Sequence, residues 1–280
     1  IHMAFLSADE FLVLEKGTGK VKRIVSGAVH STVLDLAVNA ADDRGLLSIA
    51  LHPDFPANPG VYLFWTESST GQDSIDGMAL PLMGNRVDRF TWTGNTLVFD
   101  RNIIRLRALQ TDSPPRFNLN GGVIRFAPRS GKDRRTEDRR HDANIAKLFV
   151  IVGTMGRRGY MQNNLHGPVA DDAFGGPVPD DAHLTGVVLR LNDDGSTPRD
   201  NPFFAASAQF PGQFGFNVGK LFAYGLRNSF GMDFDPVTGE LWMQENGDDS
   251  FTEINRVLPG HNGGWIQVMG PLSRIQQYKQ

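Results

Sequence analysis

The fold is decided by a stretch that reads Leu47-Ser48-Ile49-Ala50-Leu51-His52-Pro53, then a turn, then Val61-Tyr62-Leu63-Phe64-Trp65. Short apolar runs rich in β-branched and aromatic residues, bounded by turn residues, are typical of paired antiparallel strands. The same pattern of apolar strand, turn and second strand occurs at three other places in the chain. The other copies occupy residues 3–6 with 10–14, residues 122–128 with 147–152, and residues 231–236 with 240–244.

Each copy is followed by at least one further strand-like segment, at residues 20–25, 85–92, 186–191 and 252–257. Four such groups in series predict an all-β fold, with each group forming one blade of a β-propeller. A β-sandwich built from the same hairpins is the alternative. The copies begin near residues 3, 47, 122 and 231, so long loops must separate some of them.

We expect a single propeller domain over residues 1–280, interrupted by two segments of unusual composition. Residues 129–144 carry mixed charges and no large apolar side chain, which indicates a solvated insertion within a hairpin. Residues 159–183 are rich in Asn, Asp, Gly and Pro and contain no strand pattern, which indicates a long surface loop.

Composition excludes several classes of function. The 28 Lys and Arg balance 31 Asp and Glu, for a net charge of −3, so we expect no nucleic-acid partner. The absence of cysteine excludes disulfides, thiolate metal sites and Cys nucleophiles. No apolar run approaches the ~20 residues that span a bilayer, and no secretory leader pattern is present. The 31 Gly and 16 Pro indicate many turns and few long helices.

The common catalytic and metal-binding motifs are absent. The sequence has no Gly-x-Ser-x-Gly elbow, no phosphate-binding loop, no His-Glu-x-x-His and no EF-hand. Its seven histidines show no metal-ligand spacing, and we expect His52, in a His-Pro-Asp turn, to be structural.

Two polar clusters remain as candidates. Arg227 and Asn228 stand side by side just before the strand at 231–236, and a guanidinium beside an amide suits an anionic, carboxylate-bearing ligand. A turn held by side-chain hydrogen bonds is an equally good interpretation. Residues 244–255 place four carboxylates and three side-chain amides around Gly247, which suits Ca²⁺, although a solvated acidic turn would have the same composition.

These clusters and several strand motifs resemble the soluble glucose/sorbosone dehydrogenase family, six-bladed propellers that use pyrroloquinoline quinone (PQQ) and calcium. The resemblance runs in family order through residues 44–55, 85–90, 121–126, 189–195, 224–228, 244–247, 253–255 and 260–265. It implies an oxidoreductase acting on CH–OH groups, with hydride passing from a small sugar or alcohol to PQQ with calcium assistance. It also implies a periplasmic or secreted protein.

The resemblance also assigns roles to individual residues. It gives Arg227 and Asn228 contacts to the quinone, and it gives the backbone carbonyls of Gly247 and Asp248 to the calcium ion. Family members usually carry Pro where this chain has Asp248, so a carboxylate either joins or crowds the calcium position. Glu253 matches a carboxylate that some members use for a second, structural calcium.

The chain departs from the family at the position of the general base. The family's His aligns with Leu119, and the Asp that accompanies it aligns with Thr154. A general base contributes about 10²–10⁴ in rate, so the sequence predicts slow turnover or none. A non-catalytic carbohydrate- or metal-binding propeller is the alternative.

The chain is also shorter than the family pattern. Four to five blades are readable, and we expect a fragment or a truncated gene product. The sequence does not identify the sugar substrate or the electron acceptor.

Overall fold

The computed structural model describes most of the chain, namely residues 2–109, 118–128, 146–156, 184–209, 212–248, 250–265 and 269–270. The expected insertion at 129–144 and the expected loop at 159–183 lie outside these ranges. Within the described part, β-strands dominate and the helices are short, which confirms the all-β prediction. None of these helices is long and apolar enough to cross a membrane.

The strands form four sheets. The first sheet contains β1 Met3–Phe5, β2 Glu10–Leu14, β3 Lys20–Val25 and β4 Ala28–Asp35. The second contains β5 Leu46–Leu51, β6 Gly60–Thr66, β7 Asn85–Trp92 and β8 Leu97–Leu106. The third contains β9 Gly121–Phe126, β10 Leu148–Val152, β11 Val187–Leu191, β12 Leu221–Tyr224 and β16 His261–Asn262. The fourth contains β13 Gly231–Phe234, β14 Leu241–Glu245 and β15 Glu253–Val257. Between β11 and β12 lie the helices α2 Phe204–Ser207 and α3 Gly212–Val218.

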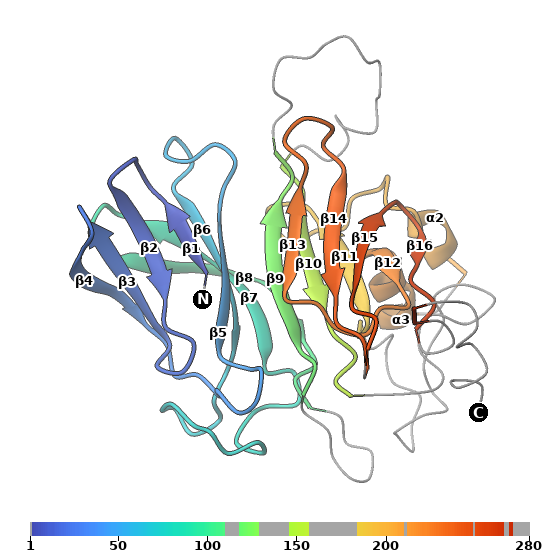
Figure 1. Cartoon of the computed structure of the whole chain (residues 1–280), viewed down its shortest axis with the longest axis horizontal. Helices are drawn as coiled ribbons and strands as arrows, with labels where there is room; N and C mark the ends of the chain where they lie inside the picture. Colours follow the sequence, from blue (N-terminus) through green and yellow to red (C-terminus); the bar gives the residue numbers. More distant parts are fainter. Residues whose placement is uncertain are drawn as a thin grey trace.

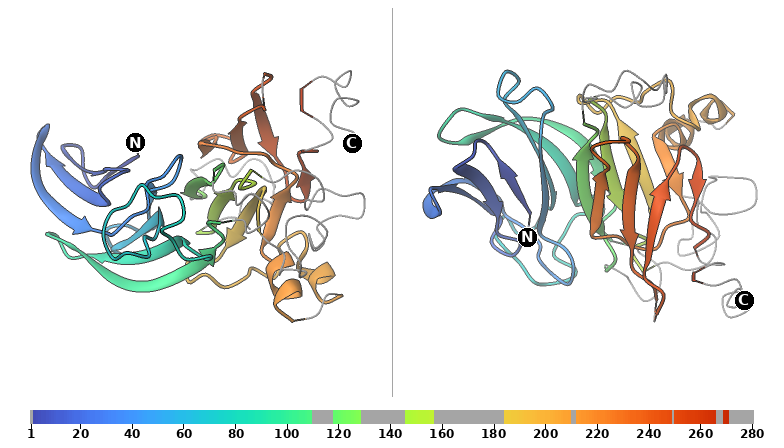
Figure 2. Two further views of the ribbon diagram at one scale, coloured as in Figure 1. Left: turned by 90° about the horizontal axis from the view of Figure 1, so that it is seen from below. Right: turned by 45° about the horizontal axis from the view of Figure 1, so that its top comes forward.

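Each of the four repeated sequence patterns becomes the first antiparallel hairpin of one sheet: β1–β2, β5–β6, β9–β10 and β13–β14. Successive sheets follow the order of the chain and stand side by side around an arc (Figures 1 and 2). The exception to local pairing is β16, which returns to the third sheet and pairs in parallel with β12. This return brings the segment after β16 next to the loop that follows β12.

The packing distinguishes a propeller from a sandwich. Alternate residues of β6 enter two different cores: Val61, Leu63 and Trp65 pack with the first sheet, while Tyr62 and Phe64 pack with the third. A third core joins the third and fourth sheets. Both inner sheets are therefore covered on both faces, as blades are, whereas a two-sheet sandwich has one core. The sandwich alternative is wrong.

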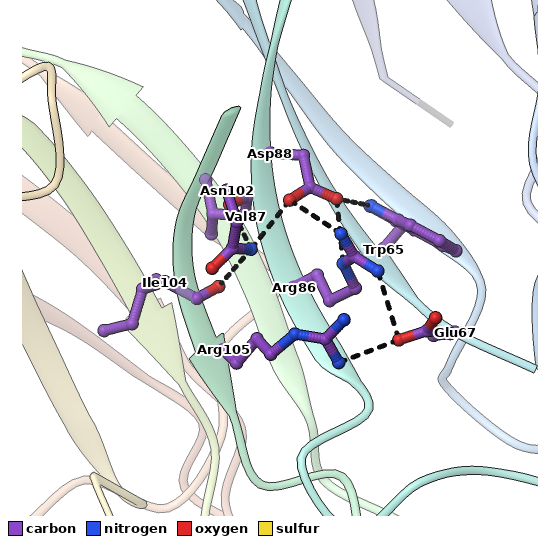
Figure 3. Close-up of polar contacts among 8 residues, drawn as sticks. All are labelled: Trp65, Glu67, Arg86, Val87, Asp88, Asn102, Ile104 and Arg105. Atoms are coloured by element: carbon purple, nitrogen blue, oxygen red, sulfur yellow. Dashed lines mark hydrogen bonds and ion pairs between the residues drawn. The ribbon is translucent and has the colours of Figure 1, made fainter. Parts of the chain in front are cut away.

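A polar network crosses β6, β7 and β8 within the second blade (Figure 3). The fully buried carboxylate of Asp88 accepts hydrogen bonds from the Trp65 indole and the Asn102 amide, both at 2.7 Å. It also pairs with the Arg86 guanidinium at 2.9 Å, which reaches Glu67 at 3.2 Å on its other side. A buried charge is tolerated only when it is paired in this way, so the network fixes the register of the three strands.

Candidate functional site

Four of the residues singled out in the sequence lie together at loops around the third sheet. The backbone N–H of Thr154, after β10, donates to the carbonyl oxygen of Arg227, after β12, at 2.9 Å. The side-chain Oδ1 of Asn228 accepts the backbone N–H of Gly121, at the start of β9, at 2.9 Å. Leu119 lies two residues before Gly121. The positions to which the resemblance assigns the base, its partner and the quinone contacts therefore lie close together.

Close backbone packing holds the Leu119 segment in place. The Leu119 carbonyl oxygen accepts the N–H of Met155 at 3.1 Å. A Cβ at Gly153 would stand 2.0 Å from that carbonyl oxygen and 2.5 Å from Oδ1 of Asn228, so only glycine fits there. Leu119 itself has φ +61°, a left-handed conformation that leucine rarely adopts and that His and Asn adopt more readily.

The next residue, Asn120, anchors this segment to the second blade. Its side-chain Nδ2 donates to Asp43 at 2.7 Å, and its backbone N–H donates to the other carboxylate oxygen of Asp43 at 2.9 Å. Its Oδ1 accepts from the side chain of Asn85 at 2.9 Å. Sequence reasoning assigns no role to Asn120 or Asp43, because they are 77 residues apart and share no motif.

The Arg227 guanidinium points toward the acidic turn after β14. Its Nη1 donates to the carbonyl oxygen of Asn246 at 3.2 Å, and its Nη2 pairs with Oδ1 of Asp248 at 2.9 Å. The Trp265 ring lies on one face of the guanidinium, with its centroid 5.4 Å from the guanidinium carbon. The Arg227 Nε is buried and has no hydrogen-bond partner among the described residues.

Two more buried polar atoms, on Asn228 and Thr154, have no hydrogen-bond partner among the described residues. Asn228 is 2 % exposed, and its Nδ2 makes no hydrogen bond within the described ranges. The hydroxyl of the fully buried Thr154 likewise makes none to any described residue. A buried polar group without a partner costs about 1–3 kcal/mol, so unpartnered donors on the neighbouring residues Arg227 and Asn228 are candidates for contacts with a ligand that supplies acceptors.

The buried carboxylate of Glu245 holds the backbone of Arg227 in place. Glu245 follows Leu241 and Met243 on the inward face of β14 and is 1 % exposed. It accepts the backbone N–H of Arg227 at 2.6 Å and the Asn255 amide at 3.1 Å. Burial raises the pKa of Glu245 to about 7, and the nearby charge of Glu253 adds to the increase. Glu245 continues the every-second-residue pattern of Leu241 and Met243, so the sequence alone could have predicted that its carboxylate faces inward.

The predicted calcium residues lie on the turn after β14 and on β15. A Cβ at Gly247 would stand 2.1 Å from the Ser250 carbonyl oxygen, so the turn closes tightly there. The Glu253 carboxylate accepts the backbone N–H of Gly270 at 2.8 Å. Across the described ranges, no group of three or more His, Asp or Glu side chains gathers as a metal site.

Carbonyl and carboxylate oxygens are the ligands that Ca²⁺ takes, so the turn after β14 fits that ion in chemical kind. The carboxylate of Asp248, however, is engaged by Arg227. The site therefore presents the Arg227 cation, the Asn228 amide donor and the Trp265 indole face beside an oxygen-rich turn. This combination suits a planar anion together with a divalent cation.

The two positions that the resemblance aligns with the base and its partner hold an alkyl side chain at Leu119 and a hydroxyl at Thr154, and neither is a general base. The two open interpretations of the Arg–Asn cluster both describe part of what is seen. The turn is held by side-chain hydrogen bonds, and it still presents donors that have no partner within the part of the chain the structure describes.

Comparison with known proteins supports the resemblance. The chain is 29% identical over 275 residues to quinoprotein glucose dehydrogenase B of Acinetobacter calcoaceticus, covering 94% of this chain and 49% of that protein. It is 27% identical over 265 residues to the aldose sugar dehydrogenase YliI of Escherichia coli, covering 94% of this chain and 57% of the other. The chain thus spans about half the length of the curated relatives it matches.

Solved structures of the same kind share the fold of this chain. A crystal structure of a protein from Thermus thermophilus, described as a glucose dehydrogenase, matches with a TM-score of 0.68 and 28% identity. That match covers 96% of this chain and 64% of the other. The soluble aldose sugar dehydrogenase of Escherichia coli, in its apo form, matches with a TM-score of 0.66 and 25% identity, covering 96% and 63%.

The sequence model of one family, described as glucose/sorbosone dehydrogenase, matches residues 1–113 and 159–273. This match covers well over half of the chain and includes the hairpins β1–β2, β5–β6 and β13–β14. The hairpin β9–β10 lies between the two matched parts, together with Leu119 and Thr154. The protein therefore belongs to the glucose/sorbosone dehydrogenase family.

Proposed function

We propose that this protein binds PQQ and Ca²⁺ at the loops between β12 and β14 and acts as a PQQ-dependent sugar or alcohol dehydrogenase with an impaired proton-transfer step. The observation that carries the proposal is that the neighbouring residues Arg227 and Asn228 each keep a buried donor with no partner among the described residues, and that the Arg227 guanidinium reaches the oxygen-rich turn after β14. Two curated relatives are named as a glucose dehydrogenase and an aldose sugar dehydrogenase, which supports a sugar as the substrate.

Arg227 and Asn228 would hold the quinone. A guanidinium binds a carboxylate through parallel N–H donors, and an amide N–H adds a neutral donor next to it. Trp265 already lies against the guanidinium and limits where it can turn. When bound, the quinone supplies the hydride acceptor and Ca²⁺ polarises it.

The turn at Gly247 and Asp248 would hold the catalytic Ca²⁺ through backbone carbonyls, as the family resemblance implies. Glu253 is the candidate for a second, structural Ca²⁺. Both assignments use oxygen ligands, which Ca²⁺ prefers. The Glu253 carboxylate accepts hydrogen bonds from Gly270 and Asn255, one on each oxygen, and these contacts would orient it as a ligand.

Proton removal is the step at which this chain differs. A substrate hydroxyl must lose its proton as hydride leaves, and an alkyl group at Leu119 cannot accept it. Water must then take the proton, at a cost of about 10²–10⁴ in rate. We expect a periplasmic or secreted location from the resemblance, with a small sugar or alcohol as substrate.

Reconstitution tests this proposal. The purified chain is incubated with PQQ and CaCl₂, binding is followed by quenching of tryptophan fluorescence, and aldose oxidation is followed by reduction of an artificial dye. Saturable binding with slow, aldose-dependent dye reduction supports the proposal. Failure of PQQ to bind in the presence of Ca²⁺ refutes it.

A second candidate is a non-catalytic propeller that binds a carbohydrate or a metal ion. The residues at the two proton-transfer positions, Leu119 and Thr154, favour it. The same experiment separates the candidates, because this one predicts no dye reduction at any pH and binding of sugar or Ca²⁺ measurable by calorimetry.

A further inference from the structure

The guanidinium of Arg227, which we propose binds the quinone, already forms an ion pair with the carboxylate of Asp248. Their atoms Nη2 and Oδ1 are 2.9 Å apart, and the side chains are 12 % and 22 % exposed. The other terminal nitrogen, Nη1, donates to the Asn246 carbonyl oxygen. Both ends of the guanidinium are thus engaged by groups of the same turn.

Asp248 is the only carboxylate that pairs with this guanidinium among the described residues. Glu245 accepts the backbone N–H of Arg227 and not its side chain. Removing the Asp248 charge would therefore leave the cation held by one neutral carbonyl oxygen, an indole face and no anion from the described part of the chain.

We propose that Asp248 is an internal counter-anion that competes with an anionic ligand for Arg227 and so sets the affinity of the site. The inference rests on the proposed function, since it concerns the same guanidinium. An incoming carboxylate takes two parallel N–H donors of a guanidinium, and on Arg227 it competes with Asp248 for any pair that includes Nη2. Exchanging one partly buried partner for another lowers the apparent affinity by the strength of the internal pair, about three- to tenfold.

The charge-neutral substitution Asp248→Asn tests the proposal, because the side chain keeps its size and loses its charge. PQQ is titrated in EDTA, without Ca²⁺, into the wild-type chain and the variant, and binding is read from tryptophan fluorescence. Asp233→Asn is the matched control, since Asp233 lies on β13 of the same blade and is exposed. It makes the same change in net charge without touching Arg227.

The proposal predicts binding about three- to tenfold tighter for Asp248→Asn than for the wild type and the control. Equal or weaker binding by Asp248→Asn overturns it, and so does an absence of binding in every protein. The proposed function is judged separately, by PQQ binding to the wild type with Ca²⁺ present. A wild type that binds with Ca²⁺ while Asp248→Asn shows no gain refutes only the competition.

A second measurement needs neither PQQ nor activity. Phenylglyoxal modifies accessible guanidinium groups, and peptide mass spectrometry reports the rate at Arg227. Faster labelling of Arg227 in Asp248→Asn than in the wild type and Asp233→Asn is expected, and equal rates contradict the proposal. If Asp248→Asn does not fold, as shown by its thermal unfolding curve, Asp248→Ala replaces it in both measurements.

Discussion

The backbone N–H of Gly121 donates a hydrogen bond of 2.9 Å to the side-chain Oδ1 of Asn228, across 107 positions of the chain. The contact fixes which end of the amide faces the β9 strand. The opposite end, Nδ2, is then a donor, and it has no partner in the described part of the chain. One hydrogen bond therefore links β9 to the loop after β12 and orients the amide that we propose binds the quinone.

Replacing Asn228 by Asp tests that orientation. Asp keeps an acceptor for the Gly121 N–H and converts the free donor into a negatively charged oxygen. We expect PQQ affinity to fall by about tenfold or more, because a buried carboxylate repels an anionic ligand. Fluorescence titration measures the change. Unchanged affinity would mean that Nδ2 does not face the ligand.

Restoring a base tests the account of the missing proton acceptor. The left-handed backbone at Leu119 suits histidine, so we expect Leu119→His to fold, and Thr154→Asp to supply a carboxylate near it. The double variant should oxidise aldoses about 10²-fold faster than the wild type in the dye assay. Leu119→Asn with Thr154→Asp is the control, since Asn suits the same backbone and is not a base. Equal rates in all three proteins, each loaded with PQQ, would show that proton transfer is not what limits turnover.

Glu245 predicts how stability depends on pH in metal-free buffer. Its pKa is raised by burial from 4.5 to about 7 in the folded state, so the fold favours the protonated carboxyl. That contribution is complete below about pH 4.5 and is lost as the pH rises through 7, by roughly 2–3 kcal/mol. Urea unfolding at about pH 5 and pH 8 should show this loss in the wild type and little of it in Glu245→Gln. The same loss in both proteins would assign it to another group.

The close approach of Gly153 to Leu119 predicts a large effect from one methyl group. Gly153→Ala places a Cβ 2.0 Å from the Leu119 carbonyl oxygen, which forces the two loops apart. We expect the free energy of unfolding to fall by about 2–4 kcal/mol. Gly17→Ala is the control, because its nearest neighbour is 4.0 Å away, and it should be neutral or slightly stabilising. Similar values for both variants in urea titrations would contradict the packing described for this loop.

The network of Figure 3 predicts a contrast between a buried and an exposed carboxylate. Asp88→Ala leaves the Arg86 guanidinium and the Trp65 indole short of an acceptor, and should cost about 3–5 kcal/mol. Asp35→Ala removes an exposed pair of 4.0 Å with Lys20, and should cost less than about 1 kcal/mol. Urea unfolding of both variants gives the comparison, and equal losses would argue against the network.

The inner strands can be predicted from the sequence because they are buried on both faces. β6 and β10 read as unbroken apolar runs, and the segment predicted at residues 85–92 has the same bounds as β7. The outer strands β4 and β8 escape prediction because they face solvent over much of their length. Within β4, only Val33 is buried.

The candidate site divides in the same way. Arg227 and Asn228 are neighbours in the sequence and can be found by their chemistry, although their ligand cannot. The pairing of Asp248 with Arg227, and of Asn120 with Asp43, joins segments that only the folded sheets bring together. Spacing along the chain does not predict such contacts.

Calorimetric titration of PQQ in the presence of Ca²⁺ decides whether the Arg227 guanidinium binds an anionic quinone. Arg227→Lys keeps the charge and loses the planar pair of donors, so the account predicts a single site per wild-type chain and affinity weaker by about tenfold or more in the variant. Equal affinities in the two proteins, or no heat of binding in the wild type, would contradict it.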